Sequence, residues 1–111
     1  MGCQIFKLSK PWPVEERYAL TDQIRRSARS VSSNICEAWA KRRYEAHFVS
    51  KLTDADGELQ ETENWLRFAC AHEYISQSTF DTYDALIREV GRMLGSMIQN
   101  PAPFILRNEK E

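Results

Sequence analysis

The sequence predicts an all-α protein, an antiparallel up-down four-helix bundle in which one short helix precedes three long ones. Three observations predict this class. Apolar residues recur every three or four positions over most of the chain, no segment sustains the alternating pattern of a strand, and the four prolines stand only near the two ends. We therefore expect long, uninterrupted helices that meet along apolar stripes.

The first element expected is a short helix over residues 3–9, within an N-terminal segment that covers residues 1–12. Pro13 suits the first turn of the next helix, because its missing N–H would have no partner there. The long helices are expected over residues 13–41, 44–73 and 77–99. Short connections make consecutive helices antiparallel neighbours.

Each long helix carries one stripe of apolar or small residues, which we expect to face the core. Ser76 and Ser78 are candidate N-caps for the last helix, after a turn near residues 74–78. The tail, residues 100–111, contains two of the prolines, and its final charged residues are expected to be mobile. The three stripes are Thr21, Ile24, Ala28, Val31, Ile35 and Ala38; Phe48, Leu52, Ala55, Leu59, Thr62, Leu66 and Ala69; and Phe80, Tyr83, Ile87, Val90, Leu94 and Met97.

The length of 111 residues fits one domain, residues 1–111, with one core. No apolar run is long enough to cross a membrane, the N-terminus lacks the apolar region of a secretory signal, and Phe6 stands where the myristoylation pattern needs Ser or Thr. Three cysteines without a C-x-x-C pair favour a reducing compartment. We therefore expect a cytoplasmic protein with no membrane partner, and Cys36 and Cys70 as small core residues.

The net charge of −1 is unevenly distributed along the chain. Residues 1–53 hold ten Lys and Arg against five Asp and Glu, whereas residues 54–111 hold five against eleven. Such asymmetry indicates either a basic binding face or two oppositely charged helices in contact. The basic candidates for contact with phosphates of RNA or DNA are Arg25, Arg29, Lys41, Arg42 and Arg43. The alternative is that these side chains pair with the acidic segment 54–63 or cap helix ends.

A second, polar stripe follows the same helix at helical spacing. Its small polar residues would permit close approach, so we expect a buried polar contact between helices or subunits, with Arg26 and Glu37 as charged members that must be paired. Large aromatic residues off the apolar stripes, such as Trp39 and Phe68, also favour an oligomer. The polar set is Gln23, Arg26, Ser30, Ser33, Asn34 and Glu37, together with Glu61 on the next helix.

The residues give little sign of an enzyme. The chain has no Gly-rich phosphate loop and no set of nucleophile, base and orienting residue, and no Glu stands three positions before His47 or His72, as a di-iron bundle requires. We expect no catalytic residue, no cofactor and no metal. The alternative is an enzyme whose pocket lies at a subunit boundary and uses Glu61, His47 or Cys36.

Two blocks carry a resemblance to a known family. "ERYALTDQIRRSARSVSSNICEAWAKR" (residues 16–42) and "GELQETENWLRFACAHEYIS" (residues 57–76) resemble the four helix bundle protein family that includes proteins encoded in 23S ribosomal RNA intervening sequences, and more distantly the accessory variability proteins of diversity-generating retroelements. The matching positions are Gln23, Ile24, Arg25, Arg26, Ser30, Ser33, Asn34, Ile35, Glu37, Gly57, Leu59, Glu61, Leu66 and Tyr74.

The resemblance implies a left-handed antiparallel bundle that assembles as a homopentamer, in the cytosol of a bacterium, with a nucleic-acid or ribonucleoprotein role. It also implies a fuller first helix than the last turns that "IFKLSK" represents here. We therefore expect a non-enzymatic scaffold or binding module, with direct binding of RNA or DNA by arginines of the second helix as the alternative.

Overall fold

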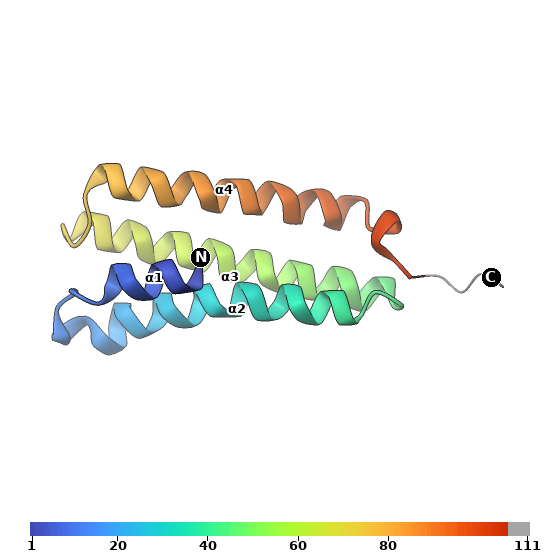
Figure 1. Ribbon diagram of the computed structural model, residues 1–111, viewed down its shortest axis with the longest axis horizontal. Helices are drawn as coiled ribbons and strands as arrows, with labels where there is room; N and C mark the ends of the chain where they lie inside the picture. The colour runs from blue at the N-terminus through green and yellow to red at the C-terminus, as the bar shows by residue number, and fades with distance from the viewer. Residues whose placement is uncertain (107–111) are drawn as a thin grey trace.

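The computed structural model describes residues 1–106, and no strand occurs among them. Four α-helices follow one another: α1 (Gly2–Ser9), α2 (Asp22–Ala40), α3 (Glu45–Ala71) and α4 (Gln77–Gln99). Consecutive helices reverse direction, so the bundle is antiparallel with up-down topology (Figure 1). The all-α class and the one-short, three-long arrangement predicted from the sequence are confirmed. The expected mobility of the last charged residues falls on 107–111, outside the described residues.

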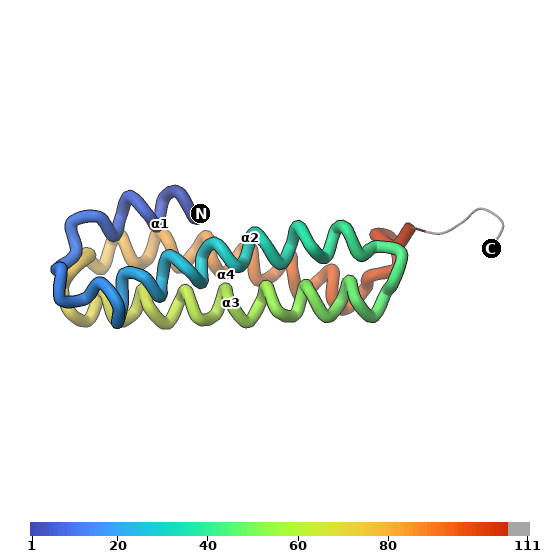
Figure 2. The backbone as a smooth tube through the Cα atoms, turned by 90° about the horizontal axis from the view of Figure 1, so that it is seen from below, coloured from blue at the N-terminus to red at the C-terminus, as the bar shows by residue number. Residues whose placement is uncertain are grey.

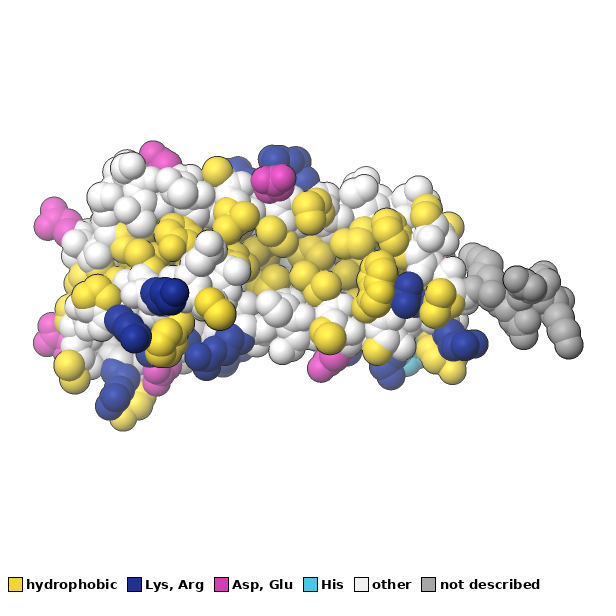
Figure 3. Space-filling view, in the orientation of Figure 1, with side chains coloured by type: hydrophobic (Ala, Val, Ile, Leu, Met, Phe, Trp, Pro, Cys, Tyr) yellow, Lys and Arg dark blue, Asp and Glu magenta, His cyan; other side chains and the backbone are white. Residues whose placement is uncertain are grey.

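The bundle is elongated, with extents of 57 × 23 × 17 Å, because the three long helices run side by side (Figure 2). The most extensive contacts between helices are those of α1 with α2, α2 with α3, and α3 with α4. At 1.5 Å per residue, α1 spans about 12 Å and α4 about 35 Å. Because α1 is short, it covers only part of the seam between α2 and α4. Hydrophobic side chains line the rest of this seam (Figure 3).

The predicted helix over 13–41 is not uniform. A 3₁₀ turn (Val14–Glu16) and a π turn (Arg17–Thr21) precede α2. Pro13 is extended, with φ −55° and ψ 142°, so the helical path starts after it rather than at it. The adjacent residues Leu20 and Thr21 are both buried, and the wider π turn allows both of them to face the core.

The apolar stripes form the core as predicted. All seven residues of the second stripe are buried in α3, and Phe80, Ile87 and Leu94 of the third are buried in α4. Two buried hydroxyls also meet between α2 and α3, where Ser27 Oγ lies 2.8 Å from Thr62 Oγ1. A backbone carbonyl of its own helix also lies within hydrogen-bond distance of each hydroxyl. One hydroxyl can therefore donate to its carbonyl while the other donates across to it, and neither is left without a hydrogen bond.

One cysteine prediction is wrong. Cys36 is exposed, whereas Cys70 is half-buried. Ile35 and Ala38 belong to the stripe that packs on the core, and at about 100° per residue position 36 turns away from that stripe. Cys36 is therefore a surface residue of α2.

The turn between α3 and α4 is defined by caps at both sides. The N–H of Tyr74 donates to the carbonyl of Ala69 and that of Glu73 donates to Cys70, which is the Schellman arrangement at the end of α3. Glu73 has φ 64°, a left-handed conformation that favours glycine. Ser76 then caps α4, because its hydroxyl accepts from the N–H of Thr79 at 3.0 Å. The predicted N-cap at Ser76 is confirmed.

The segment after α4 returns to the bundle. Phe104, in a 3₁₀ turn (Ala102–Phe104), lies 6.3 Å from Phe48 and 6.2 Å from Trp39 between ring centroids. The N–H of Leu106 donates to the carbonyl of Arg42. This segment therefore covers the end of the core at the turn between α2 and α3.

Candidate functional site

The charged residues of the predicted polar stripe pair with α3 rather than with each other. Arg26 donates to Glu61 at 2.7 Å and to Glu58 at 3.4 Å, while Lys51 contacts Glu37 at 2.7 Å. Arg26 and Glu37 are eleven residues apart on α2, which is about 16 Å along the axis, so within one chain they do not pair with each other and each has its partner on α3. These cross-pairs instead join α2 to α3.

The ion pairs shift the pKa values of their basic members, although the side chains stay partly exposed. The hydrogen bond to Glu61 raises the pKa of Arg26 above its usual value, against the opposing effect of burial. The hydrogen bond to Glu37 likewise raises the pKa of Lys51. The Arg26 side chain remains 50% exposed. In a single chain these charged side chains are therefore paired with α3 but still exposed to solvent.

The small polar members of the stripe are also only partly covered. Asn34 donates to the carbonyl of Ser30 at 2.9 Å and is half-buried, as are Gln23 and Ser30, whereas Ser33 is exposed. The chain alone does not bury this stripe. Its burial between subunits stays a prediction.

An aromatic series extends the charged contacts along α3. The indole N–H of Trp65 donates to Glu61 at 3.3 Å, the same carboxylate that holds Arg26. Trp65 then contacts Phe68 at 5.9 Å between centroids, and Phe68, 47% exposed, stacks on His72 at 6.4 Å. We call Arg26, Glu58, Glu61, Trp65 and Phe68 the α2–α3 face.

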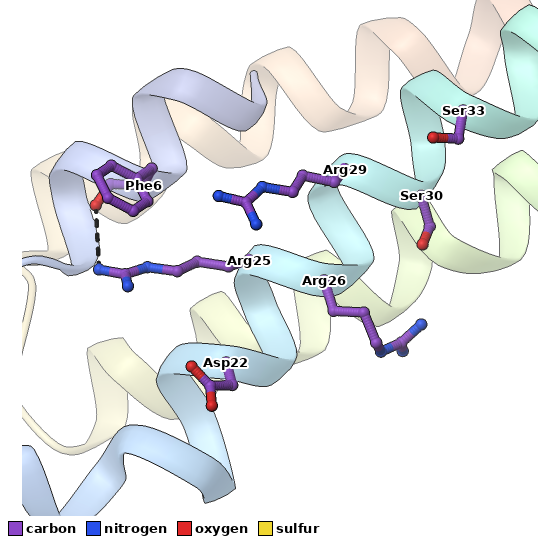
Figure 4. Close-up of a pocket in the computed structure, with 7 residues that line it drawn as sticks. All are labelled: Phe6, Asp22, Arg25, Arg26, Arg29, Ser30 and Ser33. Atoms are coloured by element: carbon purple, nitrogen blue, oxygen red, sulfur yellow. Dashed lines mark hydrogen bonds between the residues drawn. The ribbon is translucent and has the colours of Figure 1, made fainter.

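The arginines that the sequence singles out for phosphates diverge from Arg26. In Figure 4, Arg25 and Arg29 both point toward Phe6 of α1, and Arg26 points to the other side of α2. Arg25 donates to Ser9 Oγ at 2.8 Å and to the carbonyl of Phe6 at 3.4 Å, so it also ties α2 to the end of α1. Its guanidinium carbon lies 4.3 Å from the centroid of the Phe6 ring. Among residues 1–106, neither Arg25 nor Arg29 forms an ion pair with a carboxylate.

The remaining basic candidates lie at the opposite end of α2. Lys41 is twelve residues beyond Arg29, about 18 Å along the axis, and Arg42 and Arg43 follow it in the turn. Arg42 donates to the carbonyl of Trp39 at 2.9 Å and lies 4.2 Å from the centroid of its ring. The five basic candidates therefore form two groups and not one surface.

The residues suggested for an enzyme site, Glu61, His47 and Cys36, do not come together within one chain. Glu61 and His47 are fourteen residues apart on α3, about 21 Å, and Cys36 is on the surface of α2. Within residues 1–106, no three His, Cys, Asp or Glu side chains are grouped so that they could hold a metal ion. In the same part of the chain, no helix has the length and apolar character needed to cross a membrane.

The sequence analysis did not identify the α1 residues that lie beside Arg25 and Arg29. Phe6 lines the hollow beside Arg25 and Arg29, Lys7 lines the adjoining one, and Lys10 lies 5.4 Å from the Phe6 centroid. The spacing of Phe6 and Lys10, four apart on a short helix, was the available signal. Their meeting with α2 depends on how α1 docks.

Comparison with known proteins supports both the fold and the resemblance of the two sequence blocks. The chain is similar to a crystal structure of a protein of unknown function from the S23 ribosomal protein family of Bacteroides thetaiotaomicron, with 28% identity over 89% of this chain and 92% of that one, and a TM-score of 0.78. No curated protein matches the sequence significantly. The family model described as 23S rRNA-intervening sequence protein matches residues 1–96, which confirms the resemblance seen in the two sequence blocks. The chain belongs to the 23S rRNA-intervening sequence protein family.

Proposed function

We propose that the protein is a non-enzymatic, homo-oligomeric helical scaffold or binding module that serves a ribonucleoprotein in the bacterial cytoplasm, with a pentamer as the favoured assembly. The observation that carries this proposal is the α2–α3 face, where Arg26, two carboxylates, Trp65 and a half-exposed Phe68 form one continuous series. The pentamer and the ribonucleoprotein role rest on the family resemblance.

The composition of the α2–α3 face suits a subunit contact. Trp, Tyr, Phe and Arg are enriched at the centres of protein interfaces, and truncation of Trp, Tyr or Arg there costs the most binding energy. Burial of charged groups is costly unless they are paired. Here Arg26 and Trp65 already donate to Glu61 within the chain, so a second copy could cover them without leaving these groups unpaired.

Substitution of an exposed side chain in the face tests the scaffold proposal. Phe68→Ser should lower the sedimentation coefficient of the assembly or dissociate it, because it removes exposed aromatic area from the contact. The matched control is Met93→Ser on α4, where the apolar side chain is similarly exposed at 56%. Equal sedimentation of wild type, Phe68→Ser and Met93→Ser at matched concentrations would remove the α2–α3 face from the proposal.

A second candidate function is direct binding of nucleic acid. The observation that favours it is that Arg25 and Arg29 point to one side of α2 and have no carboxylate partner within residues 1–106. Phosphate contacts release counterions, so binding would weaken steeply as salt rises. Filter binding of total bacterial RNA at low and high salt checks this candidate. Retention that is absent at low salt, or unchanged by salt, contradicts it.

A further inference from the structure

A groove follows the junction of α1 with α2 and collects positive charge. Three adjoining hollows make it up: a middle one of about 420 Å³ that Phe6, Arg25 and Arg29 line, one of about 800 Å³ toward the start of α1, and one of about 210 Å³ toward the π turn. Lys and Arg side chains gather over this part of the molecule in Figure 3. We call it the α1–α2 groove; its basic residues are Lys7, Lys10, Arg17, Arg25 and Arg29, and Arg26, which is paired with Glu58 and Glu61, also lines the middle hollow.

Three of these cations surround a single aromatic ring. Arg25, Lys10 and Arg29 lie 4.3, 5.4 and 5.9 Å from the centroid of Phe6. Like charges gathered around one ring repel one another, and within residues 1–106 none of the three forms an ion pair with a carboxylate. Asp22 lines the same hollow, three residues or about 4.5 Å along the axis from Arg25, but seven residues or about 10 Å from Arg29. An anion at the Arg29 end would relieve the repulsion.

The groove also has free hydrogen-bond donors. A guanidinium has five N–H donors. Arg25 uses two donors for Ser9 and the Phe6 carbonyl, and the side chain of Arg29 makes no hydrogen bond within residues 1–106. The hydroxyl of Ser33 lines the hollow as well and is exposed. Such donors match the oxygens of a phosphate group.

We infer that the α1–α2 groove binds single-stranded nucleic acid, with phosphates on Arg25, Arg29 and the α1 lysines and a base against Phe6; this inference rests on the nucleic-acid candidate above. The cations are spread along the groove: Arg17 and Arg29 are twelve residues apart, about 18 Å, so a single phosphate could not engage them all. A basic groove that contains an aromatic side chain is the usual site for single strands, whose bases are free to stack. Bases paired in a duplex could not reach Phe6.

The basic group at the other end of α2 provides the control. Arg43 and Arg29 are both exposed arginines, and neither makes a hydrogen bond or ion pair within residues 1–106. Their charge reversals change the net charge of the chain by the same amount. A difference in binding between Arg29→Glu and Arg43→Glu therefore reports position and not overall charge.

Fluorescence anisotropy with a labelled 20-nucleotide oligouridylate, at several salt concentrations, tests the groove. The wild type should bind, Arg29→Glu should weaken binding at least ten-fold and make the logarithmic salt dependence shallower by about 0.7, and Arg43→Glu should change affinity by less than about two-fold. Phe6→Leu should weaken binding about ten-fold with little change in salt dependence. Circular dichroism of each variant confirms that the helices are intact.

The results separate the groove from the function on which it rests. Equal losses for Arg29→Glu and Arg43→Glu overturn the groove and leave nucleic-acid binding standing. Equally tight binding of a 20-base-pair RNA duplex overturns the preference for a single strand. No binding of the oligouridylate or of total RNA by the wild type at low salt overturns both.

Discussion

Substitution of Arg26 distinguishes an α2–α3 face that a second copy covers from one that is exposed to solvent. Arg26→Ala leaves Glu58 and Glu61 without the cation that joins them to α2, while Glu61 keeps the indole N–H of Trp65. The same substitution has very different consequences for an isolated chain and for an assembly that buries this face.

For an isolated chain the loss is small. The Arg26 side chain is 50% exposed and those of Glu58 and Glu61 are 23% and 34% exposed, and ion pairs of this exposure contribute about 0–1 kcal/mol. For a domain of this length, that corresponds to a fall in Tm of about 5 °C at most. If a second copy covers the face, two carboxylates lose their partner in a buried contact, which costs about 3–5 kcal/mol. The dissociation constant would then rise on the order of 10² to 10³-fold.

The assay compares two arginines of similar exposure. Arg67 contacts Glu63 at 3.3 Å, with side-chain exposures of 53% and 26%, and lies on the other side of α3. Analytical ultracentrifugation over a dilution series, with thermal melts of the same samples, should show a weakened assembly for Arg26→Ala and none for Arg67→Ala. If both variants lower Tm by a similar few degrees and leave the mass unchanged, Arg26 belongs to a solvated surface and the interface reasoning is refuted.

Three further predictions concern the turn after α3 and the contact of α3 with α4. Ser76→Ala should lower the free energy of unfolding by about 1 kcal/mol, because the N–H of Thr79 loses its cap; a denaturant midpoint that does not move would contradict this. Glu73→Gly should raise the same free energy by about 1 kcal/mol, because φ 64° strains a residue with a Cβ; a loss of stability in the same titration would contradict it. Burial acts to raise the pKa of Asp84, but the hydrogen bond and charge of Arg88, together with Glu63 and Arg67 on α3, outweigh it, so the folded pKa lies below its usual value. Asp84 then stabilises the fold above about pH 3.9, and this contribution is lost as the pH falls through the folded pKa. Asp84→Asn should therefore flatten the stability curve below about pH 4, and parallel curves for the two proteins would exclude this role.

Helical periodicity predicted the architecture because it depends on local spacing. The α3 stripe from Phe48 to Ala69 is buried at every predicted position, and the cap at Ser76 is present. Where local geometry departs from a regular helix, the spacing gave no warning. The π turn that buries both Leu20 and Thr21 shows this limit. Cys36 is a different case, because α2 is regular there and its spacing places position 36 away from the apolar stripe; the residue type, and not the spacing, had suggested the core.

The site was less predictable, since it depends on which helices meet. Sequence spacing grouped Arg25 with Arg29 correctly, yet it also joined Lys41 to them, about 18 Å away along α2. It indicated that Arg26 and Glu37 need partners but not which ones, and each pairs across to α3. The contribution of Phe6 depends on the docking of α1, which no periodicity within α2 can report.

The oligomeric state of the wild-type chain tests the central claim most directly. Size exclusion with light scattering over a hundred-fold range of concentration should give a mass well above the 12.9 kDa of the chain if the α2–α3 face is the proposed subunit contact. The pentamer that the family resemblance favours would have about five times that mass. A mass of 12.9 kDa at every concentration would contradict the proposal, and with it the interpretation of Arg26, Trp65 and Phe68 as interface residues.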